Sequence, residues 1–325
     1  MKYASGTRPE GFTTETADVL VEALPWIKSI TGKTVVIKYG GSAMVDEQLR
    51  ADVMSDIVLL KIIGVNPIIV HGGGHAITEA MEKEQLPVEF KNGQRVTSPK
   101  AMKVVKTILV GQVNQELVGA MNDHGGVAVG VSGSDAGTIM AKQKDPDLGR
   151  VGSITRINTT YLEDLLAADY IPVVASVAMG EDGGYYNVNA DMAAGHIAAA
   201  LGAHKIIFLT DVDGLYERFG EEDTLISNMT QFECEEMIES PSTSKGMIPK
   251  LQSCVTALKA GVFRAHIVNG TVPHSIFLEL FTDAGIGTVI HSTEEACLND
   301  THPLGNFASK LAENVETSDF VEIEE

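Results

Sequence analysis

The sequence contains few cysteines and no apolar segment long enough to cross a membrane. Its three cysteines, Cys234, Cys254 and Cys297, are scattered, and none belongs to a CxxC pair. An odd number of scattered cysteines is typical of reduced thiols, so we expect neither a disulfide framework nor a protein-bound metal. No apolar run approaches the ~18 residues of a membrane-spanning helix, and the N-terminus lacks the apolar block of a signal peptide. These absences predict a cytoplasmic protein that does not enter membranes.

Basic residues are also scarce. There are 24 Lys and Arg against 44 Asp and Glu, which gives a formal net charge of −20. Such a surplus of negative charge repels the phosphate backbone of nucleic acids, so nucleic acid is not an expected partner, although a local basic site could bind a small anion. The final segment, 311–325, carries six acidic residues and no basic residue, which is typical of a solvated tail.

Short apolar runs alternate with segments of helical spacing along most of the chain. β-Branched runs bounded by Gly, Pro or Asn predict buried strands over 34–38, 66–70, 127–131, 171–176, 205–210 and 264–268. Helical spacing predicts helices over 46–63, 75–84, 99–123, 160–168, 189–201, 231–239 and 247–261. This alternation predicts an α/β fold in which helices cover both faces of a mainly parallel open sheet. The Lys-, Asp-, Pro- and Gly-rich stretch 138–157 is expected to be an exposed hairpin.

Residues 14–30 form a separate amphipathic segment before the first predicted strand. Val19, Leu20 and Leu24 fall on one helical face, and Pro25 is expected to kink or end the first part of the helix. The pattern alone fits two roles equally: an arm that packs against another subunit, or an extra surface helix.

Two glycine-rich turns follow two predicted strands, IKYGGS (37–42) and IVHGGGHAI (69–77). Each turn leads toward a helix, whose N-terminus offers free N–H groups and the positive end of the helix dipole to an anion such as phosphate. Lys38 ends the first of these strands, where an unpaired ammonium would be costly. Its partner is expected to be either a core carboxylate or a phosphate group.

Other polar residues could belong to the same site, and each also has a structural interpretation. The amides of Asn187 and Asn189 and the carboxylate of Asp191 could hold a ligand or cap the helix that follows. The Asp211-to-Gly214 segment ends a buried strand and could bind a ligand or form an Asx turn. The guanidinium of Arg95 could clamp a substrate carboxylate or simply lie on the surface.

Taken in order, six motifs make the chain resemble the amino acid kinase family, and within it the N-acetylglutamate kinases. The motifs are KYGG (38–41), VHGGG (70–74), NGxRVT (92–97), NVNAD (187–191), TDVxG (210–214) and GMxxK (246–250). The resemblance implies a three-layer αβα sandwich and ATP-dependent phosphorylation of the γ-carboxylate of N-acetyl-L-glutamate to N-acetyl-L-glutamyl 5-phosphate, the second step of arginine biosynthesis. Mg²⁺ would arrive with ATP, so the resemblance implies no metal held tightly by the protein.

The resemblance also implies roles for individual residues. Lys38 and Lys250 would flank the transferring phosphoryl group, and Asp191 would hold both lysines in place. The residues implied to bind the acceptor are Gly73, Gly74, Arg95, Asn187 and Asn189. The residues implied to bind the nucleotide are Gly40, Gly41, Asp211, Asp213, Gly214, Tyr216, Ser242, Thr243 and Ser244.

The N-terminal helix and the run 265–290 resemble the arginine-inhibited, hexameric branch of the family. In that branch the helix interlaces dimers into a ring and L-arginine binds between the helix and the C-terminal lobe. The resemblance therefore implies a homo-oligomer, either a trimer of dimers or a dimer, and L-arginine as effector. The implied effector site consists of Lys205, His266, Glu279 and Gly285. Departures from the usual residues of this branch are Trp26, Asn269 and Thr271.

The resemblance divides the chain into four parts. They are an N-terminal arm for oligomerisation (1–31), an N-acetylglutamate-binding lobe with the dimer interface (32–202), an ATP-binding lobe with the arginine site (203–291) and an acidic tail (292–325). Two alternatives remain: another amino acid kinase that acts on a different carboxylate or on carbamate, and a catalytically silent, effector-binding homologue. The silent homologue predicts loss of Lys38, Lys250 or Asp191, and all three are present.

Overall fold

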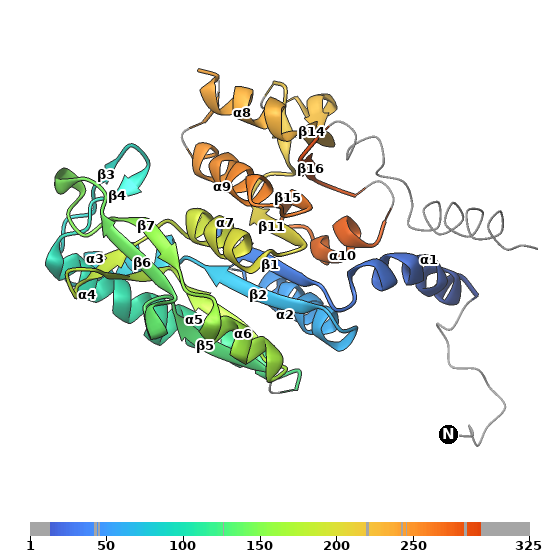
Figure 1. Ribbon diagram of the computed structural model, residues 1–325, viewed down its shortest axis with the longest axis horizontal. Coiled ribbons are helices and arrows are strands. Elements are labelled where there is room, and N and C mark those ends of the chain that lie inside the picture. The colour runs from blue at the N-terminus through green and yellow to red at the C-terminus, as the bar shows by residue number, and fades with distance from the viewer. Residues whose placement is uncertain are drawn as a thin grey trace, which may run out of the picture.

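An eight-stranded sheet forms the centre of the protein (Figure 1). The computed structural model describes residues 14–41, 44, 46–125, 127–218, 221–241, 243–244, 246–282 and 285–293. The sheet has the strand order β14-β16-β15-β11-β1-β2-β8-β5. Its strands are β1 (Thr34–Tyr39), β2 (Asn66–His71), β5 (Ala128–Ser132), β8 (Ile171–Ala175), β11 (Lys205–Thr210), β14 (Asn228–Thr230), β15 (Arg264–Asn269) and β16 (Thr288–His291). Strands from β5 to β15 pair in parallel, β16 is antiparallel to β15, and β14 is parallel to β16.

Helices cover both faces of this sheet, because consecutive strand residues point to opposite sides. Val36 packs on one face with α6 (Thr160–Ala167), α7 (Ala190–Leu201), α8 (Gln231–Glu239) and α9 (Ile248–Lys259). Its neighbours Val35 and Ile37 pack on the other face with α2 (Glu47–Ile62), α5 (Asn114–Asn122) and α10 (Ser275–Leu280). The two cores confirm the predicted three-layer αβα sandwich with a mainly parallel open sheet.

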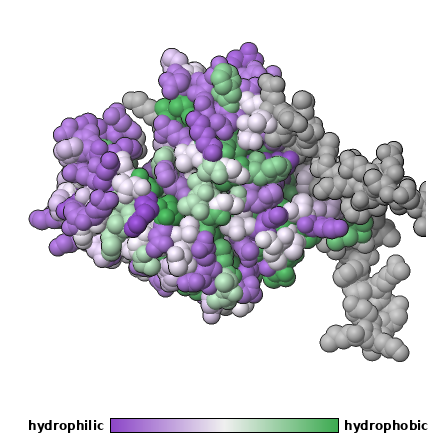
Figure 2. Space-filling model, in the orientation of Figure 1, coloured by the Kyte–Doolittle hydropathy of each residue, from purple (hydrophilic) through white to green (hydrophobic). Residues whose placement is uncertain are grey.

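A smaller sheet and a hairpin lie beside the central sheet, on the left of Figure 1. The smaller sheet has the order β10-β9-β6-β7, with β6 (Ile139–Gln143), β7 (Gly152–Ile157), β9 (Val177–Gly180) and β10 (Tyr185–Asn187). The hairpin pairs β3 (Phe90–Lys91) with β4 (Gln94–Arg95), and Lys91 ties it to Asp147 at 2.6 Å. Figure 2 shows hydrophilic residues gathered on this side. The 138–157 stretch does form an antiparallel pair, but Ile139 and Ala141 are buried, so it is not the exposed excursion that we expected.

The strands predicted from apolar runs and the predicted helices all occur, with bounds that shift by a residue or two. Pro99 begins α4 (Pro99–Lys106) behind the Ser98 cap, Thr230 and Glu233 form a capping box, and Gly202 ends α7. The long helix expected over 99–123 is interrupted by a π-helical segment, Thr107–Val113, before α5 begins. The strands that sequence reasoning missed, such as β14 and β16, are short.

The N-terminal helix α1 (Thr14–Ile30) extends away from the body of the molecule at the right of Figure 1. It does not end at Pro25, as one of our two expectations held, but continues through it to Ile30, which is buried in the core. Val21 and Leu24 are 63% and 57% exposed. The 1–13 part of the expected arm and the expected tail beyond Thr293 lie outside the described residues. The boundary expected at 202/203 falls in the turn between α7 and β11, and the division into lobes stays a prediction.

Candidate active site

Two lysines from different parts of the chain converge on one carboxylate. Lys38 stands near the end of β1, Asp191 is the second residue of α7, and Lys250 lies in the first turn of α9. The Nζ atom of Lys38 is 3.0 Å from Oδ1 of Asp191, and the Nζ atom of Lys250 is 3.2 Å from Oδ2. One carboxylate therefore bridges two ammonium groups, and the three charges sum to +1.

The surroundings of Asp191 keep it ionised. Burial by itself raises the pKa of this carboxyl, but the positive charges and hydrogen bonds of Lys38 and Lys250 outweigh burial and hold the pKa below its usual value. Lys38 and Asp191 are both largely buried, at 8% and 5% exposure. The carboxylate partner considered for Lys38 is thus present, and one positive charge remains that a phosphoryl group could neutralise.

The first glycine turn lies directly beside Lys38. A β-carbon on Gly40 would come 2.8 Å from the Nζ atom of Lys38, and one on Gly41 would collide with the carboxylate of Asp211. Gly41 also has a φ of +82°, which disfavours other residues. The positive φ therefore favours glycine at position 41, Gly40 leaves room for the Lys38 ammonium, and Asp211 closes this turn from the end of β11.

The second glycine turn forms the floor of a cavity of about 210 Å³. Residues that line it include Gly72, Gly73, Gly74, Phe90, Gln94, Arg95, Leu109, Ser176, Asn187 and Asn189. The guanidinium of Arg95 donates to the carbonyl of Gly74 at 2.9 Å and to Oγ1 of Thr78 at 2.7 Å, and it lies 4.7 Å from the ring centroid of Phe90. Burial lowers the pKa of Arg95. Arg95 is thus a cavity residue, not a surface one.

The two asparagines that line this cavity play different local roles. Nδ2 of Asn187 donates to Oγ1 of Thr97 at 3.3 Å. Asn189 caps α7, because its Oδ1 accepts the backbone N–H of Met192 at 3.0 Å. The cap interpretation of Asn189 is therefore correct, and the residue also borders the cavity.

A larger cavity of about 890 Å³ lies between β12 (Leu215–Tyr216) and the α8–α9 region. Gly214, Tyr216, Thr243 and Ser244 line it with apolar neighbours such as Met229 and Met247. Asp213 accepts from Nδ2 of Asn269 at 2.7 Å and from the Tyr216 hydroxyl at 2.7 Å, and these hydrogen bonds lower its pKa. At the start of this segment Oγ1 of Thr210 accepts the N–H of Val212 at 3.1 Å. Ser242 lies outside the described residues.

Sequence reasoning missed the residues that support the second glycine turn. His71 is fully buried, and its Nδ1 lies 2.9 Å from the carbonyl oxygen of Gly72. Its Nε2 lies 3.0 Å from Nδ2 of Asn114, which is also buried. The apolar run before His71 predicted the strand, but no sequence pattern indicated that Asn114, on a helix far along the chain, would contact His71.

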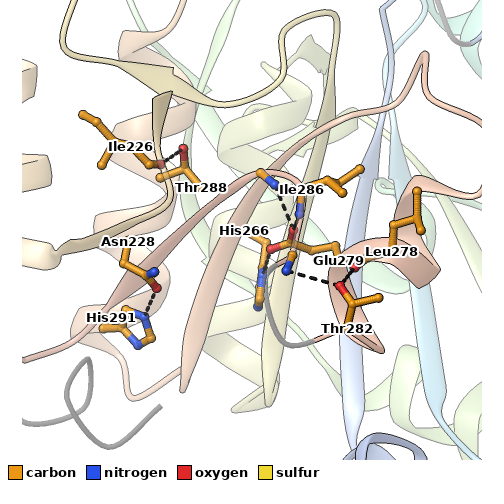
Figure 3. A network of polar contacts seen from close by, with 11 residues as sticks. Ile226, Asn228, His266, Leu278, Glu279, Thr282, Ile286, Thr288 and His291 are labelled. Carbon is orange, nitrogen blue, oxygen red and sulfur yellow. Dashed lines mark hydrogen bonds and ion pairs between the residues drawn. The ribbon is translucent and has the colours of Figure 1, made fainter. Parts of the chain in front are cut away.

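A second polar cluster joins His266 of β15 to Glu279 of α10 (Figure 3). The neighbours of His266 and Lys38 along their strands pack in different cores, so the two side chains point to opposite faces of the sheet. Nδ1 of His266 is 2.6 Å from Oε1 of Glu279, and Oε2 of Glu279 accepts the N–H groups of Ile286 and Gly287 at 2.9 and 3.0 Å. Burial raises the pKa of Glu279, but these hydrogen bonds reverse the effect and lower it overall, whereas burial and the nearby charge of Lys205 lower the pKa of His266. Gly285 has a φ of +60° and packs against the Glu279 carboxylate.

The described residues contain neither a membrane-spanning helix nor a cluster of metal ligands. None of the helices in the described ranges is long and apolar enough to cross a bilayer. Within the part of the chain that the structure describes, no three His, Cys, Asp or Glu side chains are grouped so that they could hold a metal ion.

Comparison with known proteins identifies the family. Residues 33–269 match the model of the amino acid kinase family. The acetylglutamate kinase of Streptomyces avermitilis is 49% identical over 86% of this chain and 94% of its own length, and that of Caldanaerobacter subterraneus subsp. tengcongensis is 50% identical over 84% and 92%.

Solved structures agree with this result. Neisseria gonorrhoeae N-acetylglutamate synthase, complexed with coenzyme A and N-acetyl-glutamate, superimposes with a TM-score of 0.75 at 25% identity, over 85% of this chain and 63% of that longer chain. The same synthase complexed with coenzyme A and L-arginine superimposes with a TM-score of 0.70, over 65% of that chain. With Lys38, Asp191 and Lys250 converging beside two glycine turns, the chain belongs to the amino acid kinase family.

Proposed function

We propose that this protein transfers the γ-phosphoryl group of ATP to the γ-carboxylate of N-acetyl-L-glutamate, in the second step of arginine biosynthesis and in the cytoplasm. One observation carries the proposal: Lys38 and Lys250 meet at Asp191. The residue before Asp191, Ala190, lines the smaller cavity, and Met247, three residues before Lys250, lines the larger one. About half of the residues are identical to those of the acetylglutamate kinases named above, over most of both chains.

The two lysines supply the charge that this reaction needs. An anionic carboxylate that attacks an anionic phosphate is repelled, and the loose transition state spreads negative charge over the equatorial oxygens of the phosphoryl group. Lys38 and Lys250 would stabilise those oxygens, and Asp191 holds both ammonium groups in one place. The acceptor carboxylate is already ionised at neutral pH, so the site needs no general base.

The two cavities suit the two substrates. In the smaller cavity Arg95 and Asn187 would bind the α-carboxylate and the acetamide group, Asn189 borders them, and the N–H groups of Gly73 and Gly74 would lie under the γ-carboxylate. In the larger cavity the apolar lining would take the base. The residues that we propose to bind the nucleotide are Gly40, Gly41, Asp211, Asp213, Gly214, Tyr216, Ser242, Thr243 and Ser244. Mg²⁺ would enter with ATP, as part of that substrate.

The cluster around Glu279 supports a site for L-arginine. Nε2 of His266 is buried and makes no hydrogen bond to the described residues, so it could accept one from a guanidinium. Glu279 would supply the opposite charge, beside Lys205 and Gly285. The proposed assembly is a homo-oligomer, either a hexamer built as a trimer of dimers through α1 or a dimer, since α1 presents exposed Val21 and Leu24.

A coupled assay of ADP release tests the proposed function. N-acetyl-L-glutamate, L-glutamate, N-acetyl-L-aspartate and carbamate are compared as acceptors, with and without L-arginine. The proposal expects turnover with N-acetyl-L-glutamate far above that with the others, and inhibition by L-arginine. Equal turnover with another acceptor would favour a different amino acid kinase, and no turnover with any would favour the silent homologue.

A further inference from the structure

The glycine turn under the acceptor cavity is held from two sides. The carbonyl of Gly74 accepts from Arg95, and the carbonyl of Gly72 faces Nδ1 of His71. Between these two points lie the N–H groups of Gly73 and Gly74, at the start of α3 (Gly74–Lys83), which has no side-chain cap. The direction of those N–H groups therefore depends on where the flanking carbonyls are held.

The hydrogen bonds of Asn114 fix the tautomer of His71. Nδ2 of Asn114 lies 2.8 Å from the carbonyl oxygen of Val173 and 3.0 Å from Nε2 of His71. The carbonyl of Val173 requires a donor, so the nitrogen of the amide must be the atom placed there. Since an amide nitrogen only donates, Nε2 of His71 must accept, and the ring proton resides on Nδ1, where it donates to Gly72.

The π-helical segment brings Asn114 into this position. The backbone N–H of Asn114 bonds to the carbonyl of Leu109, five residues back, so these two residues lie about one turn apart. In a regular α-helix they would be separated by about 140° around the axis. The π turn thus lets Leu109 line the cavity while Asn114 reaches His71.

Two glycines make room for this arrangement. A β-carbon on Gly73 would lie 2.8 Å from Cδ2 of Leu109 and 3.1 Å from Cγ2 of Val113, so the π turn packs directly under the glycine turn. A β-carbon on Gly130 of β5 would collide with Oδ1 of Asn114. Gly130 therefore leaves the space that Oδ1 of Asn114 occupies while Nδ2 donates to Val173 and His71.

We propose that Asn114, acting through the imidazole of His71, is a positioning residue for the acceptor side of phosphoryl transfer, because it fixes the carbonyl of Gly72 and with it the glycine turn. The inference rests on the proposed function. Burial lowers the pKa of His71 to about 4, so the ring stays neutral and keeps one fixed donor. On β1, the residue in register with His71 is Tyr39, whose pKa is raised by burial. On β8, the residue in register with His71 is Ala175, which does not titrate.

The test compares two Asn→Asp variants on the same helix. Asn114→Asp replaces the donor to His71 by a carboxylate, which can only accept, so the single proton of the neutral ring moves from Nδ1 to Nε2 at high pH. The unprotonated Nδ1 then repels the carbonyl oxygen of Gly72. Asn122→Asp is the matched control: Nδ2 of Asn122 also donates to a strand carbonyl, that of Ala128, at 3.2 Å, but Asn122 does not touch the glycine turn. For each protein kcat and KM are measured for the acceptor and for ATP between pH 6 and 8.5.

For Asn114→Asp we expect kcat/KM for the acceptor to fall about 10- to 100-fold at pH 8, with the KM for ATP changed less than about twofold. The loss should shrink toward pH 6, because the new carboxylate raises the pKa of His71 and the imidazolium donates from both nitrogens. Asn122→Asp should follow the wild type. A loss independent of pH, an equal loss for ATP, or the same loss in Asn122→Asp would overturn the inference.

A measurement on the wild-type protein keeps the inference testable if Asn114→Asp fails to fold. In ¹⁵N-histidine NMR, with His71→Gln to assign the signal, we expect a neutral Nδ1–H ring for His71 from pH 8 down to pH 5.5. An Nε2–H ring, or protonation above pH 6, would overturn the inference. Wild-type protein that is inactive on N-acetyl-L-glutamate contradicts the proposed function instead, and the variants are then compared on whichever acceptor it does phosphorylate.

Discussion

The ammonium group of Lys38 and the carboxylate of Asp191 form a 3.0 Å ion pair that joins β1 to α7. Neither group could be left alone in the interior, since an isolated buried charge is costly. The pair therefore explains how a lysine can stand at the end of an apolar strand, and the second lysine on Asp191 leaves the cluster with a net positive charge.

Removing either lysine should abolish most of the activity without unfolding the protein. We expect Lys38→Ala and Lys250→Ala each to lower kcat about 10²- to 10³-fold, because each removes a charge that stabilises the transition state. Lys61→Ala is the control, since Lys61 also pairs with an aspartate, Asp169, at 2.5 Å, but at the far end of α2. Steady-state kinetics measures kcat, and circular dichroism shows whether each variant is folded. Wild-type turnover in both variants would contradict the catalytic roles proposed for the two lysines.

Arg95→Ala should chiefly weaken binding of the acceptor. Arg95 lines the smaller cavity and holds the carbonyl of Gly74, so we expect the KM for N-acetyl-L-glutamate to rise by about 10- to 100-fold while the KM for ATP hardly changes. Arg150→Ala is the matched control, because the Arg150 guanidinium pairs with exposed Asp182 instead. A selective rise in the KM for ATP would contradict this assignment.

Deleting residues 1–30 should divide the assembly into smaller units and weaken inhibition by L-arginine. The helix α1 exposes apolar residues such as Val21 and Leu24. Its last residue, Ile30, is buried in the same hydrophobic core as Ile276 and Leu280 of α10, the helix that carries Glu279. Size-exclusion chromatography with light scattering measures the mass, and the coupled assay measures inhibition. An unchanged mass would refute the role of the arm.

His71 should make the protein less stable in acid. Its pKa is lowered from 6.5 to about 4 by burial, so the neutral form is favoured in the folded state, and this contribution is present above about pH 6.5 and is lost as the pH falls toward 4. Between pH 7.5 and 5 the free energy of unfolding of the wild type should fall about 2 kcal/mol more than that of His71→Gln. Urea denaturation at both pH values measures the difference, and equal losses in the two proteins would rule the effect out.

Much of the fold could be predicted because it depends on local patterns. The central strands are continuous apolar runs such as Lys205–Thr210, and their burial on both faces leaves a clear signal. The π segment and the short strand β16 were not predicted. The π segment depends on how Leu109 and Asn114 pack under the glycine turn and the sheet, and β16 depends on its antiparallel pairing with β15, which lies on the other side of α10 in the sequence. Pro25 was misjudged in part, because the helix continues despite the missing N–H.

The site was predictable residue by residue only where a motif carried it. The three residues of the charge cluster, Lys38, Asp191 and Lys250, are 59 residues or more apart along the chain, and only the fold brings them together. The order of the motifs that contain them was the signal in the sequence. His71 belongs to the VHGGG motif, but its contact with Asn114 was missed, because it joins a strand to a helix 43 residues away and no sequence pattern indicates it.

The most direct test of the account is a crystal structure with ADP, Mg²⁺, aluminium fluoride and N-acetyl-L-glutamate, in which the fluoride stands for the transferring phosphoryl group. We expect the Nζ atoms of both Lys38 and Lys250 to lie within about 3 Å of the fluorines, with the Asp191 carboxylate behind the two ammonium groups. Fluoride bound elsewhere, with both ammonium groups turned away from it, would contradict the account.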